Sequence, residues 1–429
     1  MSFQTGLSGL NASSRNLDVI GNNIANANTT GMKSSRAEFS NLVASSLGVG
    51  STSGAGIGVS VATVSQQFSQ GNIATTGNTM DVAINGGGFF QLTQTDGSMA
   101  YTRDGSFKLD KDGFIINNSG ANVMGFPTDT SGNITSASIQ KLQLPTNAPI
   151  KANPTATITA EFNLDARALD ATQATAAGKV PDPRSTFGTA LNVFDQQGVP
   201  SPVNFFFVKK DGTANSWDIF GGIDGVPAGI VYPNLGTMAF DASGKIVPSA
   251  PPATGFSITL AAGTIPSANP NNAVSAGGTG FLTQPITLDL TNVTQYGTAF
   301  AVSSLTQDGF TAGDLTSISI GETGAITSRY SNGQSQFTGQ ITLADFRNVQ
   351  GLLPLGGNAW AESFDSGLPV QGSPGSGKFG ALRAGALEES NVDLTSELVN
   401  LMTAQRAYQA NAQTIKTQDQ VMSTLVNLR

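Results

Sequence analysis

The side chains that carry most enzyme chemistry are scarce in this sequence. It contains no histidine and no cysteine, which excludes a Ser-His-Asp triad, a Cys-His site and any zinc site built from these ligands. Carboxylates, lysines and tyrosines remain as possible acids and bases. The enzyme class that they still permit is a two-carboxylate glycosidase, yet no pair of carboxylates stands out.

Two acidic motifs fit a structural interpretation better than a chemical one. Glu388 and Glu389 are neighbours at the expected start of a helix, where successive side chains diverge, so they suit an electrostatic cap better than an acid–base pair. Asp110, Asp112 and Gly113 resemble the opening of a calcium loop, but the FIINNSG that follows supplies no further carboxylate. We therefore predict a hairpin turn there.

Nucleotide and nucleic-acid sites are also disfavoured. The glycine stretches at 54–58 and 86–88 lack the helix, the acidic residue and the Lys-Ser/Thr pair that nucleotide loops need. The chain has 21 basic and 29 acidic residues, a net charge of −8, and no basic cluster that would follow a phosphate backbone. The residues thus predict no enzyme activity, no cofactor, no metal site and no nucleic-acid partner.

Amphipathic helices are predicted at both ends of the chain, because apolar residues recur there with heptad spacing. One interpretation is a helix pair that forms core within one chain. We favour the other, in which the apolar faces pack between copies and the ends become ordered only then, because isolated helices are marginal in water. The predicted contact residues are Phe3, Leu7, Leu10, Leu17 and Ile24 near the start, and Leu394, Leu398, Leu401, Tyr408, Ala412, Ile415 and Met422 near the end.

The sequence between the helices is typical of strands joined by glycine turns. Asp-Gly or Asn-Gly pairs at 96–97, 112–113 and 332–333 lie between alternating apolar and polar residues and predict hairpins. Fifteen of the 19 prolines fall within 145–285, which marks a separate insert. We predict a multidomain α+β chain with a terminal helical domain (1–40 and 386–429), linkers (41–69 and 368–385), a discontinuous all-β domain (70–144 and 293–367) and an inserted all-β domain (145–292).

Membrane insertion is not expected. The first residues lack a basic segment followed by an apolar one, and no stretch approaches the roughly 18 apolar residues of a membrane span. We predict a chain without a membrane span or an ordinary cleaved signal peptide.

Both ends of the chain resemble one known family. The stretch 21–39, GNNIANANTTGMKSSRAEF, resembles the N-terminal signature of bacterial flagellar rod and hook proteins, and 390–429 resembles their C-terminal signature. Met32 departs from the aromatic residue usual at its position. The stretches MDVAINGGGFFQL and YTRDGSFKLDKDGFIINNSGANVMGFP are similar to the family's β domain. The matching positions in the signatures are Asn23, Asn26, Asn28, Thr29, Gly31, Lys33, Arg36, Phe39, Ser390, Asn391, Val392, Asp393, Glu397, Gln405, Arg406, Tyr408, Asn411 and Asp419.

The resemblance implies a structural subunit of the extracellular flagellum. The insert 145–292 favours the hook members over the shorter distal rod members. In this family, subunits leave the cell unfolded through the type III export apparatus and assemble under a hook cap into a curved tube, a universal joint between rod and filament. The implied partners are further copies, the rod, the hook cap, the hook-filament junction proteins and the export apparatus.

Three alternatives remain. Within the family, a distal rod or hook-associated protein is possible. A secreted adhesin would be favoured by an exposed aromatic patch near Trp217, and a glycosidase by a cleft with two carboxylates.

Overall fold

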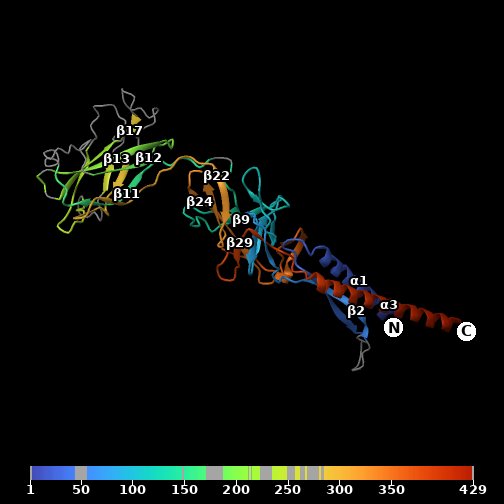
Figure 1. Ribbon diagram of the computed structural model, residues 1–429. Helices are drawn as coiled ribbons and strands as arrows, with labels where there is room; N and C mark the ends of the chain where they lie inside the picture. Colours follow the sequence, from blue (N-terminus) through green and yellow to red (C-terminus); the bar gives the residue numbers. More distant parts are fainter. Residues whose placement is uncertain are drawn as a thin grey trace. The chain divides into compact units, whose positions relative to one another are not determined.

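The computed structural model describes residues 2–43, 56–146, 149–170, 187–210, 212–213, 215–222, 234–248, 257–260, 266–267, 280–281 and 285–427. In this part of the chain, strands lie between two long helices, α1 (Ser2–Ala25) and α3 (Leu394–Asn427), near the two ends (Figure 1). The predicted combination of a mostly β chain with terminal helices is confirmed. The chain divides into two compact units, unit 1 (Met1–Asn147, Leu315–Arg329 and Gln334–Arg429) and unit 2 (Ala148–Asp314 and Tyr330–Gly333).

The two terminal helices pack side by side within unit 1 (Figure 1). Glycines on α1 allow this approach: a Cβ added at Gly6 would lie 3.2 Å from Ile415 Cγ1, and one at Gly9 would lie 3.0 Å from the side chain of Asn411. Asn411 Nδ2 also donates to Ser13 Oγ across the pair, at 3.3 Å. The ends are therefore helical and paired within one chain, the interpretation that we had not favoured from the sequence.

A hairpin of β1 (Ser35–Val43) and β2 (Gly56–Gln66) packs against α1. Its strands are antiparallel, with Ser35 opposite Gln66 and a bulge between Glu38 and Phe39. The linker prediction for 41–69 is wrong for these strands. Its Ser and Gly content suggested a linker. Apolar and polar residues alternate along β2, however, and this strand pairs with the whole of β1. Of the glycine stretch 54–58, residues 54 and 55 lie outside the described residues.

The β domain of unit 1 is built from strands that precede and follow unit 2 in the sequence. One sheet has the order β22-β23-β24-β9-β5-β6-β27-β26, and short pairs β4-β29 and β3-β30 join the C-terminal segment to the domain. The strands are β3 (Ile73–Thr75), β4 (Val82–Asn85), β5 (Phe89–Thr93), β6 (Met99–Thr102), β7 (Lys108–Leu109), β8 (Ile115–Ile116), β9 (Asn122–Phe126), β10 (Gln140–Lys141), β22 (Leu315–Ile320), β23 (Ala325–Tyr330), β24 (Ser335–Ile341), β25 (Leu343–Asp345), β26 (Leu353–Gly356), β27 (Ala359–Ala361), β28 (Val370–Gly372), β29 (Ala381–Ala384) and β30 (Ala386–Glu388), with a 3₁₀ turn at Val349–Gly351.

Two details of this domain bear on the sequence predictions. The predicted turns at 96–97, 112–113 and 332–333 are confirmed, since Gly97, Gly113 and Gly333 have φ of 88°, 81° and 81°, a backbone region that glycine adopts without strain. The linker prediction for 368–385 is wrong, because β28 pairs with β25 and β29 with β4.

Unit 2 has its own core and two main sheets. The first has the order β16-β19-β11-β20, with β21 beside β11, and the second is β12-β13-β14-β15. Its strands are β11 (Thr157–Asp165), β12 (Phe187–Phe194), β13 (Pro200–Lys209), β14 (Ser216–Gly222), β15 (Asn234–Ala239), β16 (Ser257–Leu260), β17 (Pro266–Ser267), β18 (Gly280–Phe281), β19 (Ile286–Asp289), β20 (Thr294–Tyr296) and β21 (Ala301–Gln307).

The insert is longer than its prolines indicated. It continues to Asp314 rather than ending at 292, because β20 and β21 both pair with β11. Trp217 is 0% exposed in the core of unit 2. The exposed aromatic patch that would favour an adhesin is therefore not found at this residue.

Candidate functional site: the junction of the chain ends

A buried ion cluster joins three segments that are far apart in the sequence. Glu388 Oε1 lies 2.6 Å from Lys33 Nζ, and Glu388 Oε2 lies 3.1 Å from Arg103 Nη1. The side chains of Glu388 and Lys33 are 0% exposed and that of Arg103 is 6% exposed. Lys33 Nζ also donates to the Ser69 carbonyl at 2.7 Å, and Glu388 Oε1 accepts from the Gly71 N–H at 3.0 Å. The cluster therefore ties the segments beside both helices to the β domain.

The pKa of Lys33 depends on its partner in this cluster. Burial lowers the pKa of the Lys33 ammonium, and the charge of Glu388 opposes that shift. Arg103 Nη2 donates to the Gly86 carbonyl at 2.9 Å, and its guanidinium lies 5.3 Å from the centre of the Phe89 ring. Glu388 is the last residue of β30, before the helix begins. Its predicted role in a helix cap is therefore wrong. The pairing of β30 with β3 includes Glu388, and the carboxylate of this residue is buried.

Signature residues from both ends meet beside the cluster. Asn23 accepts from the Ser35 N–H at 2.9 Å and donates to the Ser35 carbonyl at 2.8 Å, so it fixes the end of α1 to the start of β1. Asn391 accepts from the Ser34 N–H at 2.7 Å and donates to the Gln67 carbonyl at 2.7 Å. These amides satisfy backbone groups at the open end of the β1-β2 hairpin, where its strands begin and end.

The turn after α1 requires its glycine. Gly31 has φ of +70°, and a Cβ there would lie 2.5 Å from the backbone nitrogen of Asp104. The Gly31 N–H donates to the Glu388 carbonyl at 2.8 Å. Thr29 Oγ1 donates to the Asn26 carbonyl at 2.8 Å and stabilises the same turn. The signature in this stretch therefore describes one compact turn held against the β domain.

The C-terminal signature starts α3. Asp393 Oδ1 accepts from the backbone N–H of Thr395 at 2.9 Å and of Ser396 at 3.3 Å, so it caps the helix. Ser390 Oγ accepts from the Val392 N–H at 3.3 Å just before the cap. Sequence reasoning placed an electrostatic cap at 388–389, whereas the capping carboxylate is Asp393.

Other signature residues lie on the surface. Arg36 forms an exposed ion pair with Glu38 at 2.9 Å on β1, and Phe39 on the same strand is exposed. Asn28, Gln405 and Arg406 are also exposed. These positions do not belong to the junction and remain available for contacts outside the chain.

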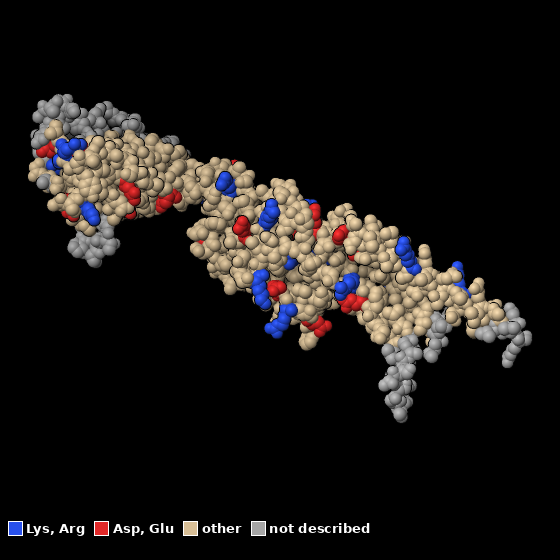
Figure 2. Space-filling model, turned by 60° about the horizontal axis from the view of Figure 1, so that its bottom comes forward, with Lys and Arg blue, Asp and Glu red and all other residues tan. Residues whose placement is uncertain are grey.

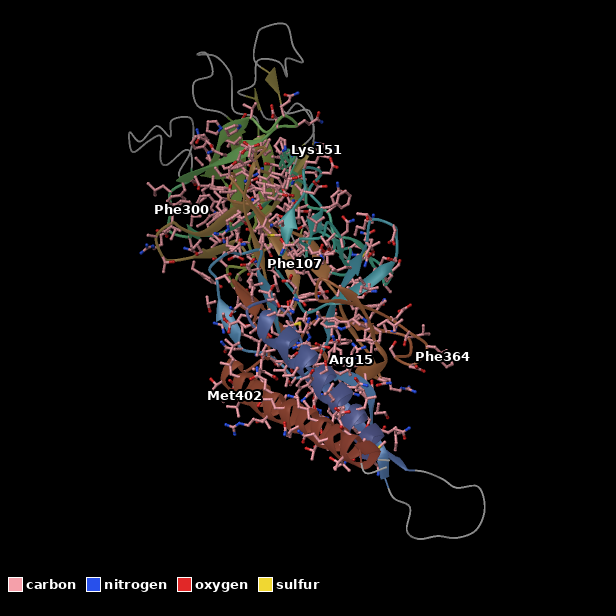
Figure 3. The ribbon with its side chains drawn as sticks, turned by 90° about the vertical axis from the view of Figure 1, so that its right-hand side faces the viewer. Arg15, Phe107, Lys151, Phe300, Phe364 and Met402 are labelled. Atoms are coloured by element: carbon pink, nitrogen blue, oxygen red, sulfur yellow. The ribbon has the colours of Figure 1, made fainter. Side chains whose placement is uncertain are left out.

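The predicted heptad residues of α3 do not share one face. Ile415 is half-buried against α1 at Gly6, and Leu401 is half-buried as well. By contrast, Leu394, Leu398, Tyr408 and Met422 are exposed, as are Val399, Met402 and Val421, which the heptad prediction missed. Figure 3 shows Met402 on the side of α3 turned away from α1. On α1, Leu10, Leu17 and Ile24 are half-buried and Leu7 is exposed, while the Phe3 side chain lies outside the described residues.

The surface otherwise carries few charges. Lysines, arginines, aspartates and glutamates are spread over the face drawn in Figure 2 without a large patch of one sign, and charged residues make up 12% of the chain. Among the described residues, no group of three or more His, Cys, Asp or Glu side chains is placed to hold a metal ion, and no helix has the length and apolar character of a membrane span.

Family models match four stretches of the chain in order. They are described as Flagella basal body rod protein (residues 3–33), Flagellar hook protein FlgE/F/G D1 domain (83–161), Flagellar basal body protein FlaE D2 domain (163–310) and Flagellar basal body rod FlgEFG protein C-terminal (383–428). Paired terminal helices, a split β domain and these matches define the class of flagellar rod and hook proteins.

Relatives that match over the full chain show to which family within this class the chain belongs. The chain is 39% identical to the flagellar hook proteins FlgE of Escherichia coli (strain K12) and of Salmonella typhimurium (strain LT2), over 100% of each chain. It is 32% identical to that of Treponema pallidum, over 100% of this chain and 99% of the relative. The chain therefore belongs to the flagellar hook protein family and is a structural subunit of the hook.

A solved structure shares the fold. The flagellar hook protein FlgE2 of Helicobacter pylori superposes with a TM-score of 0.51 at 14% identity, covering 73% of this chain and 100% of that one.

Proposed function

We propose that this hook subunit polymerises head to tail into a curved, flexible tube that joins rod to filament and transmits torque as a universal joint. The observation that carries the proposal is the apolar outer face of α3. Leu394, Leu398 and Met402 follow one another at four-residue spacing along one side of α3 and are 43%, 51% and 53% exposed although α3 already packs on α1. An exposed apolar row of this kind marks an interface. Neighbouring copies would cover it.

The proposed tube assigns a place to each part of the chain. The helix pair forms the inner wall, the β domain of unit 1 the middle wall and unit 2 the outer surface. A bending tube needs interfaces that slide, and a chain with only 12% charged residues favours many weak, similar contacts. The rod, the hook cap and the hook-filament junction proteins are its neighbours in the flagellum. We further propose export through the type III apparatus without a cleaved signal peptide.

A substitution on the outer face of α3 tests the proposal. Leu398→Asp places a charge in a contact that polymerisation would desolvate, so polymer yield should fall to background. The melting temperature of the monomer should barely change, because this side chain is 51% exposed in the single chain. Polymers are counted by negative-stain electron microscopy and sedimentation.

The matched control is Leu398→Met, which keeps the contact apolar and should polymerise like the unsubstituted chain. Normal tubes from the Leu398→Asp variant would contradict the proposed role of this face.

A further inference from the structure

The exposed methionines of the described part of the chain both lie on α3. Met402 is 53% exposed and Met422 is 62% exposed. The other methionine side chains that the structure describes are buried or half-buried: Met32, Met80, Met99, Met124 and Met238. A thioether that solvent reaches is open to oxidation to the sulfoxide, whereas a buried one is shielded. Oxidation of this chain should therefore begin on α3.

The two exposed methionines lie on different sides of this helix. Met402 follows Leu398 by four residues and so continues the exposed apolar row of α3. Figure 3 shows it on the side turned away from α1. Met422 comes 20 residues later, which places it about 160° around the helix from Met402 at about 100° per residue. Of the two, only Met402 belongs to the face that we propose neighbouring copies cover.

Oxidation would change the polarity of Met402 at the point where copies are proposed to meet. Its thioether is apolar and flexible and lies beside Leu398 and Val399, which are exposed as well. A sulfoxide adds a strong hydrogen-bond acceptor. In the free subunit, water and the exposed Gln405 and Arg406 one turn later can pair with it. An apolar surface of a neighbouring copy would displace that water, so contact with the sulfoxide form is disfavoured.

We propose that Met402 is an oxidation site that controls polymerisation. Hydrogen peroxide converts its thioether to the sulfoxide in the free subunit, and the modified subunit no longer adds to the polymer. A sulfur–oxygen bond forms, the oxygen–oxygen bond of the peroxide breaks, and the departing oxygen takes up the remaining hydrogen and leaves as water. The sulfur loses the two electrons that the peroxide gains. Enzymatic reduction of the sulfoxide restores the thioether.

This inference rests on the proposed polymerisation through the outer face of α3, and it adds a means of regulating that face. It also predicts a difference between the two states of the subunit. Met402 is accessible to peroxide before assembly and is covered after it. An oxidant would therefore stop the addition of new subunits and leave existing polymers intact.

Peroxide treatment of the purified full-length subunit tests the site. Free subunits are titrated with hydrogen peroxide and quenched, and the oxidised residues are identified by peptide mass spectrometry. Met402 and Met422 should gain oxygen before Met124 and Met238. The lowest concentration that gives polymers should rise about tenfold or more, while the melting temperature of the monomer should change little because both α3 side chains are exposed. In preformed polymers treated in the same way, Met402 should stay largely unoxidised.

Matched variants locate the effect. Met402→Leu has no sulfur at this position, so its polymerisation threshold should be the same before and after peroxide. Met422→Leu keeps the sulfur of Met402, and its threshold should rise on oxidation as in the unsubstituted chain. Met402→Gln, which is polar and flexible, should raise the threshold without any oxidant. Methionine sulfoxide reductases for both epimers should return the oxidised, unsubstituted subunit to its original threshold.

The outcomes separate this inference from the proposed function. If untreated subunits form tubes and subunits oxidised at Met402 do so at the same concentration, the oxidation site is overturned and polymerisation stands. An equal rise of the threshold in oxidised Met402→Leu would assign the effect to another residue and would overturn the site as well, as would a Met402 that does not react in the free subunit. Untreated subunits that never polymerise would overturn both proposals.

Discussion

At the residue scale, the junction of the chain ends depends on a cluster of two buried cations and one buried anion. Glu388 is the member that contacts both others, since each of its carboxylate oxygens faces a different cation. A buried ion pair adds little net stability, but the loss of one partner is expensive because it leaves an uncompensated charge. The three members should therefore differ sharply in their sensitivity to substitution.

Glu388→Gln should destabilise the monomer by about 3–5 kcal/mol, because it strands both Lys33 and Arg103 without a counter-charge. Lys33→Met should cost less, about 1–2 kcal/mol, since the Arg103 pair survives and the methionine fills the space of the lysine stem. Chemical unfolding of the purified monomers measures both values. Glu389→Gln, at the exposed neighbouring residue, is the control and should change little. A larger loss in Lys33→Met than in Glu388→Gln would refute this account.

At the element scale, two glycines of α1 have opposite roles. Gly9 faces α3, where an added Cβ would lie 3.0 Å from the Asn411 side chain, whereas Gly21 has nothing within 4 Å. Glycine lowers helix stability by about 1 kcal/mol relative to alanine. At Gly9 the close approach of the helices compensates for that loss, and at Gly21 the structure shows no such compensation.

Gly21→Ala should therefore raise the stability of the monomer by about 0.5–1 kcal/mol. Gly9→Leu should lower it by about 1–3 kcal/mol, because the larger side chain forces α3 away from α1. Thermal melting followed by circular dichroism at 222 nm measures both changes through the helical signal. Equal effects of the two substitutions would show that α1 does not use Gly9 for close packing.

At the scale of the whole molecule, the two units have separate cores. The buried cluster of unit 2 draws its residues from 158–293, and the main cluster of unit 1 draws its residues from 82–144 and 320–382. The chain enters and leaves unit 2 through neighbouring segments, since the Ile150 N–H donates to the Gly313 carbonyl at 2.8 Å. Such an arrangement is typical of an inserted domain that can be removed.

Replacing 148–314 by a short glycine-serine linker should leave unit 1 folded with a single sharp thermal transition. The deletion follows the boundary found in the structure rather than the one expected from the prolines. Differential scanning calorimetry of the purified variant checks this, and a broad transition without cooperativity would mean that unit 1 needs unit 2 to fold. We expect straighter or more fragile polymers from this variant, because the proposed outer contacts are gone.

The sequence alone determined the features that depend on local chemistry. Heptad spacing placed helices at both ends, Asp-Gly and Asn-Gly pairs placed turns where φ is positive, and long signatures at both ends carried the resemblance to the flagellar family. The absence of histidine and cysteine excluded whole classes of site. These inferences hold because helix periodicity and turn chemistry act over a few residues.

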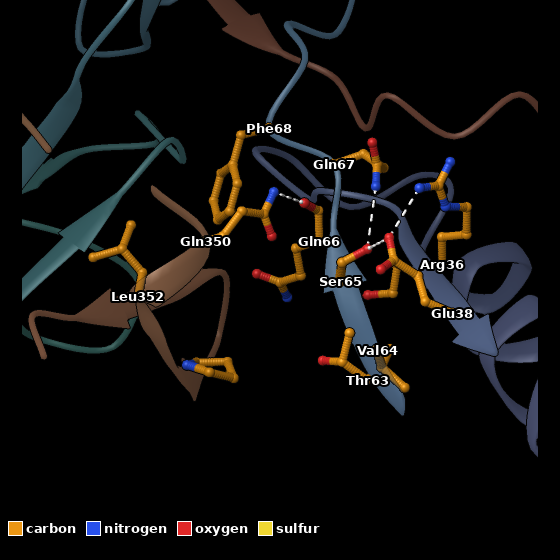
Figure 4. A pocket seen from close by; sticks show the side chains of 12 residues that line it. Arg36, Glu38, Thr63, Val64, Ser65, Gln66, Gln67, Phe68, Gln350 and Leu352 are labelled. Carbon is orange, nitrogen blue, oxygen red and sulfur yellow. Dashed lines mark hydrogen bonds and ion pairs between the residues drawn. The ribbon is translucent and has the colours of Figure 1, made fainter. Parts of the chain in front are cut away.

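Only the tertiary structure decided what depends on distant segments. Glu388 looks like a helix cap in the sequence, and it becomes the centre of a buried cluster because Lys33 and Arg103 are brought to it by the fold. The heptad spacing of α3 does not say which of its faces meets α1, since the glycines that allow its close approach lie more than 400 residues before the residues they contact. A groove beside the β1-β2 hairpin (Figure 4) is likewise lined by residues of two distant segments, 35–68 and 350–354. Which residues are buried or in contact depends on where distant segments pack together, and the local sequence does not specify that packing.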